Sequence, residues 1–170
     1  MMNRIIIVGP SGSGKSTLAK KLKDILDIPL YHLDNIWWKE DKTNISREEF
    51  DNKLSKIVEE DNWIIDGDYS RTYDMRFIRA TTIIFLDYLL EVALKGVESR
   101  IGTKRSDIPF LEDEFEIEFR EWIINWFSKT RPVLIDKLND YKRNKEIIIL
   151  HNYQETERYI NAIRTKYRKI

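Results

Sequence analysis

The sequence predicts an α/β fold in which helices cover both faces of a parallel sheet. Short, unbroken apolar runs alternate along the chain with segments of helical spacing, and unbroken runs are typical of strands that are buried on both faces. With 170 residues, the chain is long enough for one domain with its own core. No linker, repeat or low-complexity tract divides the sequence, so we expect a single domain over residues 1–170.

The apolar runs are the predicted strands. The four clear runs are Ile5–Val8, Trp63–Ile65, Ile83–Leu86 and Ile147–Leu150. Leu30–Leu33, directly after Pro29, is a weaker candidate for a fifth strand. Parallel strands require long crossover connections, and the helical segments between the runs supply them.

Helices are predicted where apolar residues recur every three or four positions. One such face follows the first strand, a second follows a capping box formed by Ser46 and Glu49, and a third lies near the C-terminus. The three faces consist of Leu18, Leu22, Ile25 and Leu26; Phe50, Leu54, Ile57 and Val58; and Tyr159, Ile160, Ile163 and Tyr167. The stretch from about 88 to 145 is expected to form two to four helices, one of them beginning near Pro132. Residues 114–119, EFEIEF, alternate as a strand would, but helical spacing continues beyond them, so we predict a helix there.

Composition narrows the classes of function. Lys plus Arg and Asp plus Glu each number 29, so the formal net charge is zero, whereas a general nucleic-acid binder usually carries a basic excess. The absence of cysteine excludes disulfides, thiolate catalysis and cysteine-ligated zinc. No apolar run approaches the roughly 20 residues of a membrane span, and no signal peptide is visible. We therefore expect a soluble cytoplasmic protein that does not bind membranes.

The segment GPSGSGKST, residues 9–17, matches the phosphate-binding pattern G-x-x-x-x-G-K-[ST]. Glycine lets the backbone curl with its N–H groups pointing inward, and the helix that follows adds its positive end. We expect Lys15 to reach the β- and γ-phosphates of a nucleoside triphosphate, Ser16 to bind Mg²⁺ and Thr17 to contact the α-phosphate. The remaining cofactor-binding residues of the predicted ATP site are Gly9, Ser11, Gly12, Ser13 and Gly14.

Three of the predicted strands end in an aspartate: Asp34, Asp66 and Asp87. Ligands of open parallel sheets gather beyond the carboxyl ends of the strands, so these acids are expected beside the phosphate-binding loop. One acid, for which Asp66 is our candidate, would hold Mg²⁺, and another, Asp34, would position or deprotonate an acceptor hydroxyl. The structural alternative is that each acid caps a helix or a turn.

Arginines follow the strand that ends at Asp66, in the segment DGDYSRTYDMR. Arg71 and Arg76 have the fork geometry that suits a phosphate oxyanion, and Arg71 is the better candidate. The alternative is that Arg76 and Arg79 lie on the exposed face of a short helix.

A second group of cations falls in or beside the polar segment GTKRSDIP, residues 102–109. A glycine and a proline flank this segment, which we predict to be a mobile loop between helices. Closure of Arg100, Lys104 and Arg105 over a γ-phosphate would stabilise the charge that is transferred and exclude water. A solvated basic loop is the alternative interpretation.

Taken together, these motifs resemble small P-loop kinases of the adenylate kinase-like group, and most closely the bacterial DNA topology modulation proteins. The resemblance rests on the segments GPSGSGKST, YHLDNIWW, WIIDGDYSRT and IIFLD, with RP at 131–132. It implies a P-loop NTPase fold of three α/β/α layers, in which a five-stranded parallel sheet has the order 2-3-1-4-5 and carries a helical lid, with a lid-like loop at about 100–112. It also implies that Arg71 is the acceptor-phosphate arginine and that Arg100 and Arg105 belong to the lid.

Two functional hypotheses follow. The first is a kinase that transfers phosphate from MgATP to an unidentified small acceptor, with Lys15, Asp34, Asp66, Arg71, Arg100 and Arg105 as its catalytic residues. The second is a regulatory P-loop NTPase that affects DNA topology through contacts with DNA or a protein, because the same loop serves switches and kinases. The basic segment RTKYRK (164–169) is the feature that would support a DNA contact. The choice between ATP and GTP stays open, and we expect base recognition in loops such as HNYQ (151–154).

Overall fold

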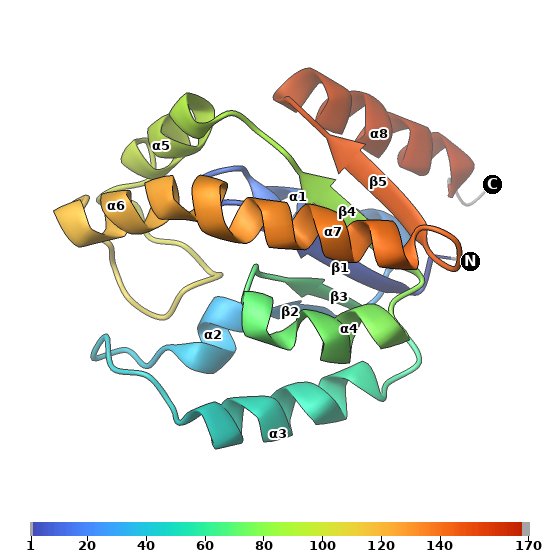
Figure 1. Ribbon diagram of the computed structural model, residues 1–170, viewed down its shortest axis with the longest axis horizontal. Coiled ribbons are helices and arrows are strands. Elements are labelled where there is room, and N and C mark those ends of the chain that lie inside the picture. The colour runs from blue at the N-terminus through green and yellow to red at the C-terminus, as the bar shows by residue number, and fades with distance from the viewer. Residues whose placement is uncertain (1, 168–170) are drawn as a thin grey trace.

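Five parallel strands form one sheet with helices on both faces (Figure 1). The computed structural model describes residues 2–167. The strands are β1 (Arg4–Val8), β2 (Leu30–His32), β3 (Trp63–Asp66), β4 (Thr82–Leu86) and β5 (Glu146–Leu150). Their order in the sheet is β2-β3-β1-β4-β5. All five predicted strands, including the weaker candidate after Pro29, and the predicted strand order are therefore confirmed.

The helices connect the strands and cover the sheet. In chain order they are α1 (Lys15–Leu26), α2 (Leu33–Trp37), α3 (Arg47–Val58), α4 (Tyr73–Arg79), α5 (Leu90–Glu98), α6 (Ile117–Asn125), α7 (Arg131–Tyr141) and α8 (Tyr153–Lys166). A 3₁₀ turn, η1 (Ser70–Thr72), precedes α4, and a π-helical turn, η2 (Trp126–Thr130), joins α6 to α7. Figure 1 shows α4 and α7 in front of the sheet and α1 behind it.

Alternate residues of each central strand supply two separate cores. On β1, Ile6 and Val8 face the core beneath α3, α4 and α7, whereas Ile5 and Ile7 face the core beneath α1 and α8. All four side chains are fully buried. Because burial of one such side chain stabilises a fold by about 1.5–3 kcal/mol, an apolar residue is favoured at every position of the strand. This is why the strands read as unbroken runs rather than as alternating ones.

Local signals mark where several helices begin. The hydroxyl of Ser46 accepts a hydrogen bond from the backbone N–H of Glu49 at 3.1 Å, which confirms the predicted cap of α3. The Glu49 side chain pairs with Lys53 at 2.8 Å rather than reaching back to the cap, so only half of the capping box forms. Pro132 lies in the first turn of α7, as predicted.

The helical region between β4 and β5 contains one long irregular segment, residues 99–116, which we call the lid segment. It lies between α5 and α6, and the N–H of Gly102 donates to the carbonyl of Glu112 at 2.7 Å, which closes the base of the loop. Helix α6 begins only at Ile117, so the prediction of helix over residues 114–116 is wrong. The lid segment therefore includes the predicted loop at 102–109 and extends beyond it on both sides.

Two further predictions concern the ends and the surface of the chain. No helix in the described range 2–167 is long and apolar enough to cross a membrane. The basic segment 164–169 includes two residues, 168 and 169, that lie outside the described residues.

Candidate active site

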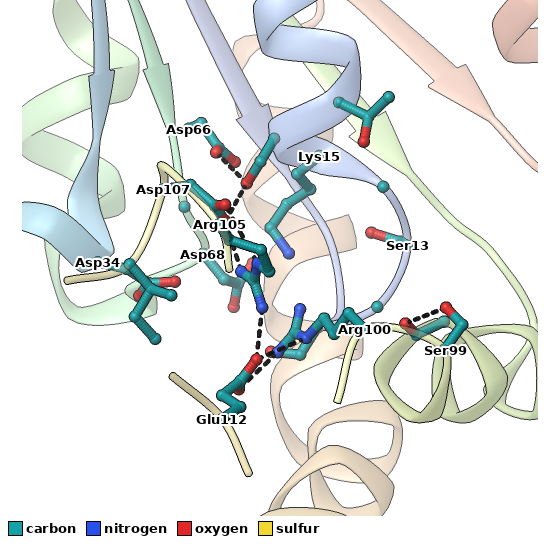
Figure 2. A pocket seen from close by; sticks show the side chains of 18 of the residues that line it. Ser13, Lys15, Asp34, Asp66, Asp68, Ser99, Arg100, Arg105, Asp107 and Glu112 are labelled. Carbon is teal, nitrogen blue, oxygen red and sulfur yellow. Dashed lines mark hydrogen bonds and ion pairs between the residues drawn. The ribbon is translucent and has the colours of Figure 1, made fainter. Parts of the chain in front are cut away.

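A single cleft of about 1130 Å³ lies at the carboxyl ends of the strands, where the phosphate-binding loop, α2, the end of β3 and the lid segment meet. Among the predicted site residues, Lys15, Ser16, Thr17, Asp34, Asp66, Arg100 and Arg105 line this cleft, together with Ser11, Gly12, Ser13 and Gly14 of the loop. Figure 2 shows Lys15, Asp34 and Arg105 pointing into the same space. The fold thus brings together residues as far apart in the sequence as Ser11 and Arg105.

The phosphate-binding loop, residues 9–14, connects β1 to α1. Gly9, Gly12 and Gly14 have positive φ angles of 141°, 85° and 86°, a backbone conformation that side chains disfavour. The Nζ of Lys15 donates to the carbonyl of Pro10 at 2.8 Å, so the ammonium group lies over the loop. Burial lowers the pKa of Lys15, although the nearby carboxylates, Asp66 first among them, oppose this shift. A phosphate oxygen would be a stronger partner for this ammonium than the carbonyl it now contacts.

Helix α5 contacts the loop through backbone atoms. A Cβ on Gly12 would lie 1.9 Å from the carbonyl oxygen of Ala93, and a Cβ on Gly96 would lie 2.0 Å from the carbonyl oxygen of Gly12. Neither position has room for a side chain, so the two glycines allow the helix and the loop to touch. The start of the lid segment is therefore anchored directly on the phosphate-binding loop. The one sign of this contact in the sequence is Gly96 itself, because a glycine within a helical segment is often retained for close packing.

Two carboxylates converge on the hydroxyl of Ser16. The Oγ of Ser16 lies 2.6 Å from Oδ2 of Asp66 and 2.9 Å from Oδ2 of Asp107. A serine hydroxyl has one proton and can donate it to only one of them. The second carboxylate therefore faces the first without a proton between them, an arrangement that a bound cation would stabilise.

The surroundings of Asp66 fit the same cation. The side chain of Asp66 is buried, and its Oδ1 has no hydrogen-bond partner among the described residues. Its Oδ2 also lies 2.7 Å from Nδ1 of His32, which fixes the orientation of the carboxylate. No group of three His, Cys, Asp or Glu side chains in metal-binding geometry occurs in the described part of the chain. Oxygen ligands of this kind fit Mg²⁺, which binds through one or two carboxylates together with substrate phosphates and water.

Asp107 and Glu112 hold the arginines of the lid segment in place. The guanidinium of Arg105 forms ion pairs with both carboxylates, and Nε of Arg100 lies 3.0 Å from Oε2 of Glu112 (Figure 2). Burial opposes the ionisation of Asp107, but the hydrogen bonds and charge of Arg105 and the Ser16 hydroxyl outweigh it and hold the pKa of Asp107 well below its usual range. Burial, followed by the charge of Arg105, lowers the pKa of Arg100. These contacts therefore favour the ionised form of Asp107 beside Ser16.

Asp34 lies in the first turn of α2 and lines the cleft. The phenol of Tyr69 donates to its Oδ1 at 2.7 Å, whereas Oδ2 has no partner among the described residues. Burial is the main cause that raises the pKa of Asp34, and the charge of Asp66 acts in the same direction against the Tyr69 hydrogen bond. Asp34 is thus a carboxylate with one free oxygen and a raised affinity for protons.

The arginines that follow β3 have different positions from those expected. Arg71 is almost half exposed and forms a bidentate pair with Asp51 at 2.6 and 2.8 Å, and it is not among the residues that line the cleft. Arg76 is fully buried, so the interpretation that it lies on an exposed helix face is wrong. Its guanidinium donates to the backbone carbonyls of Gly67, Asp68 and Tyr69 and thereby supports the floor of the cleft.

Asp68 lines the cleft and connects three elements around it. It accepts hydrogen bonds from the backbone of Gly9 at 3.3 Å, the phenol of Tyr73 at 2.7 Å and the indole of Trp126 at 2.6 Å. The third predicted acid, Asp87, pairs with Arg131 at 2.7 and 2.8 Å and does not line the cleft. Asp68 and Asp87 therefore stabilise the framework around the cleft.

Sequence reasoning did not assign Asp107, Glu112 or Tyr69 to the site. Each comes from a segment without regular structure, where spacing carries no information about which residues face inward. Along the lid segment the cations come first and the carboxylates follow from Asp107 onward, and this separation of charge was the one available signal. On the far side of the phosphate-binding loop, Tyr153 and Thr156 line the cleft, which places the start of α8 where a base could lie.

Comparisons with known proteins identify the fold. No family model matches the sequence, and no curated protein matches it. Among solved structures, the chain is similar to the shikimate kinase from Acinetobacter baumannii in complex with shikimate, at 14% identity over 99% of this chain and 97% of that chain, with a TM-score of 0.61. The shikimate kinase from Bacteroides thetaiotaomicron is 21% identical over 98% of both chains (TM-score 0.58), and a gluconokinase from Sinorhizobium meliloti is 10% identical over 97% and 95% (TM-score 0.54). The chain thus has the fold of P-loop kinases.

Proposed function

We propose that the protein is an ATP-dependent kinase that transfers the γ-phosphoryl group of MgATP to a hydroxyl group of a small acceptor. The observation that carries this proposal is the position of Asp34, a carboxylate with one free oxygen in the same cleft as the phosphate-binding loop. The regulatory alternative assigns no role to this carboxylate. The fold neighbours are kinases of small molecules, and they give that alternative no support.

In the proposed reaction, the acceptor oxygen forms a bond to the γ-phosphorus while the bond to the oxygen that bridges the β- and γ-phosphates breaks. The proton of the acceptor hydroxyl passes to Asp34, and ADP leaves. Tyr69 occupies Oδ1 of Asp34 and leaves Oδ2 for the acceptor. Because burial raises the pKa of Asp34, it is a stronger base than an exposed aspartate.

The cations of the cleft would stabilise the phosphates during transfer. Lys15 would exchange the carbonyl of Pro10 for phosphate oxygens. Arg100 and Arg105 would exchange Glu112 for the γ-phosphate, which would draw the lid segment over the nucleotide and exclude water.

Ser16, Asp66 and Asp107 would hold Mg²⁺, with phosphate oxygens and water as its remaining ligands. When bound, Mg²⁺ neutralises charge on the β- and γ-phosphates. His32 would keep Asp66 oriented toward Ser16. Because Asp107 belongs to the lid segment, binding of the ion would help to hold this segment in place.

Replacement of the proposed base tests the function. For Asp34→Asn, we expect acceptor-dependent kcat to fall about 10²–10⁴-fold, the contribution of a general base, with little change in the Kd for MgATP. ADP formation measured with and without acceptors, and calorimetry for MgATP, give the two values. The matched control is Asp51→Asn, which changes a carboxylate that does not line the cleft.

The pH profile adds a second readout. Asp34 accepts a proton only when it is ionised, so kcat of the wild type should fall as the pH decreases through its pKa, which lies above the ordinary range of aspartate. The Asn variant should lack this limb of the profile. An unchanged acceptor-dependent kcat in Asp34→Asn would contradict the role of Asp34 as the base, and slow turnover that no acceptor accelerates would contradict the kinase function.

A further inference from the structure

The acceptor end of the cleft has a charge that limits what can bind there. We define this end by two groups of residues that line the cleft. The first group is Asp34, Trp38, Tyr69 and Phe110. The second is the acidic stretch, residues 113–118, of which all but residues 115 and 117 line the cleft. Ten residues that line the whole cleft are Asp or Glu, and six are Lys or Arg. The excess of negative charge falls at the acceptor end, because Asp113, Glu114, Glu116 and Glu118 all lie there.

The cations that line the cleft are already engaged or are needed for the triphosphate. Lys15, Arg100 and Arg105 surround the place of the β- and γ-phosphates, and Lys20 and Lys21 lie on α1 beside the loop. Among the described residues that line the cleft, the one remaining cation is Lys42, whose Nζ pairs with Asp113 at 3.1 Å and lies 5.8 Å from the centre of the Phe110 ring.

The two arginines that were predicted to bind an anionic group of the acceptor form contacts with other partners. Arg71 points to Asp51 outside the cleft, and Arg76 is buried with its donors on backbone carbonyls. An acceptor with a carboxylate or a phosphate would therefore meet no free cation among the described residues of this end. It would instead face Asp34 and the acidic stretch, and like charges at close range cost binding free energy.

Aromatic rings form the rest of this end. Trp38 from the end of α2 and Phe110 from the lid segment pack edge to face, with their ring centres 5.8 Å apart. Trp37 contacts Tyr69 in the same manner at 6.3 Å, and Phe119 stacks on Trp122 near the mouth. Such surfaces bind the apolar or planar face of a ligand, and their electron-rich faces also accept cations.

We propose that the acceptor is an uncharged or cationic hydroxyl compound with an apolar or planar face, and that acceptors bearing a carboxylate or a phosphate are excluded. This inference rests on the proposed kinase function and specifies the substrate class of the same site. Asp34 would bind the reacting hydroxyl, the aromatic rings would bind the apolar or planar face, and the acidic stretch would reject anions. Nucleosides fit this description, whereas nucleoside monophosphates and sugar acids do not.

Matched pairs of compounds that differ mainly in charge test this proposal. We would use adenosine and AMP, glucose and glucuronate, and methyl shikimate and shikimate. Binding would be followed by calorimetry and by the fluorescence of Trp37, Trp38 and Trp122 with Mg²⁺ and a non-hydrolysable ATP analogue present. ADP formation from MgATP would be measured with the same compounds.

We expect the uncharged member of each pair that binds to have a Kd at least about tenfold lower, because like-charge contact at close range is costly. The ratio of the two Kd values should decrease as the salt concentration is raised from about 0.05 to 0.5 M, since salt screens exposed charges. An anionic member that binds as tightly as its uncharged partner, or more tightly, would overturn the inference and leave the kinase function intact. If no compound binds or accelerates ADP formation while MgATP still binds, the kinase function and the inference both fail.

A variant of the acidic stretch supplies an independent readout. Glu114, Glu116 and Glu118 are exposed and have no salt-bridge partner in the described range, so their joint replacement by glutamine should leave the fold intact. We expect this triple variant to reduce the ratio of the Kd values of the anionic and uncharged members of each pair several-fold. The matched control, Glu48→Gln with Asp136→Asn and Asp140→Asn, removes as much charge from exposed positions away from the cleft. Unchanged discrimination in the first variant, or an equal reduction in both, would overturn the role of the acidic stretch.

Discussion

The two ends of the cleft are built differently. The proposed phosphate end is formed mainly by one continuous segment, residues 9–17, which offers backbone N–H groups and Lys15, and the lid segment adds Arg100 and Arg105 to it. The acceptor end takes its side chains from α2, from the turn after β3 and from the lid segment. The first end depends on local backbone geometry, and the second depends on how distant segments pack together.

This difference explains how each end can change during evolution or engineering. A backbone nest tolerates few substitutions, because Gly12 and Gly96 leave no room for a Cβ where the loop meets α5. Side chains at the acceptor end can be exchanged without altering the sheet, since they come from irregular segments and from helices α2 and α6 outside the sheet. If the protein is the kinase that we propose, we expect the phosphate end to determine the reaction and the acceptor end to determine the substrate.

The largest effect is expected at the phosphate end. Lys15→Ala removes the one lysine that lies over the loop, and we expect MgATP affinity to fall about a thousandfold, because a buried charge-assisted contact contributes about 2–5 kcal/mol. Calorimetry with MgATP measures the loss. Lys23→Ala is the control, since this exposed lysine lies on the same helix, does not line the cleft and should leave affinity almost unchanged. Equal affinities in the wild type and Lys15→Ala would show that phosphate binding does not depend on this lysine.

The second prediction compares the two arginines after β3. Arg76→Met removes the donors of three backbone carbonyls from a fully buried site, and we expect the free energy of unfolding to fall by about 3 kcal/mol. Arg71→Met breaks a surface pair with Asp51 and should cost less than about 1 kcal/mol. Urea unfolding followed by circular dichroism gives both values. Similar losses in the two variants would contradict the distinction between a buried support and a surface pair.

Sequence reasoning succeeded where structure is local. The strands could be predicted because buried parallel strands have unbroken apolar runs, and the loop could be predicted because a phosphate nest requires glycines at fixed spacing. The positions of Asp34 and Asp66 at the cleft followed from the rule that strand ends meet at one edge of a parallel sheet.

Tertiary packing decided the rest. Nothing local distinguishes Arg71 from Arg76, because both follow the same strand, yet one lies at the surface and the other is enclosed. Asp107 reaches Ser16 from 91 positions away, through a segment without periodicity. Such contacts depend on the path of an irregular chain, and spacing in the sequence carries no information about that path.

The smallest expected effect concerns Asp107, a residue of the lid segment that lies beside the phosphate-binding loop. In Asp107→Asn, one of the two carboxylates beside Ser16 loses its charge, and we expect the affinity for the divalent ion in the presence of ATP to fall about tenfold, because hard cations prefer charged oxygen ligands. Titration with Mn²⁺, followed by electron paramagnetic resonance, measures the ion directly and does not require turnover.

Asp113→Asn is the matched control, because this carboxylate also belongs to the lid segment but pairs with Lys42 at its exposed rim. If Asp107 acts only by holding Arg105, the variant should weaken ATP binding equally with and without the ion, since a lost arginine contact does not depend on the metal. If Asp107 binds the ion, the loss should disappear when the metal is removed. The second result would mean that the ion at the phosphate end also fixes the lid segment that carries Phe110 and the acidic stretch, so that nucleotide binding would form part of the acceptor site.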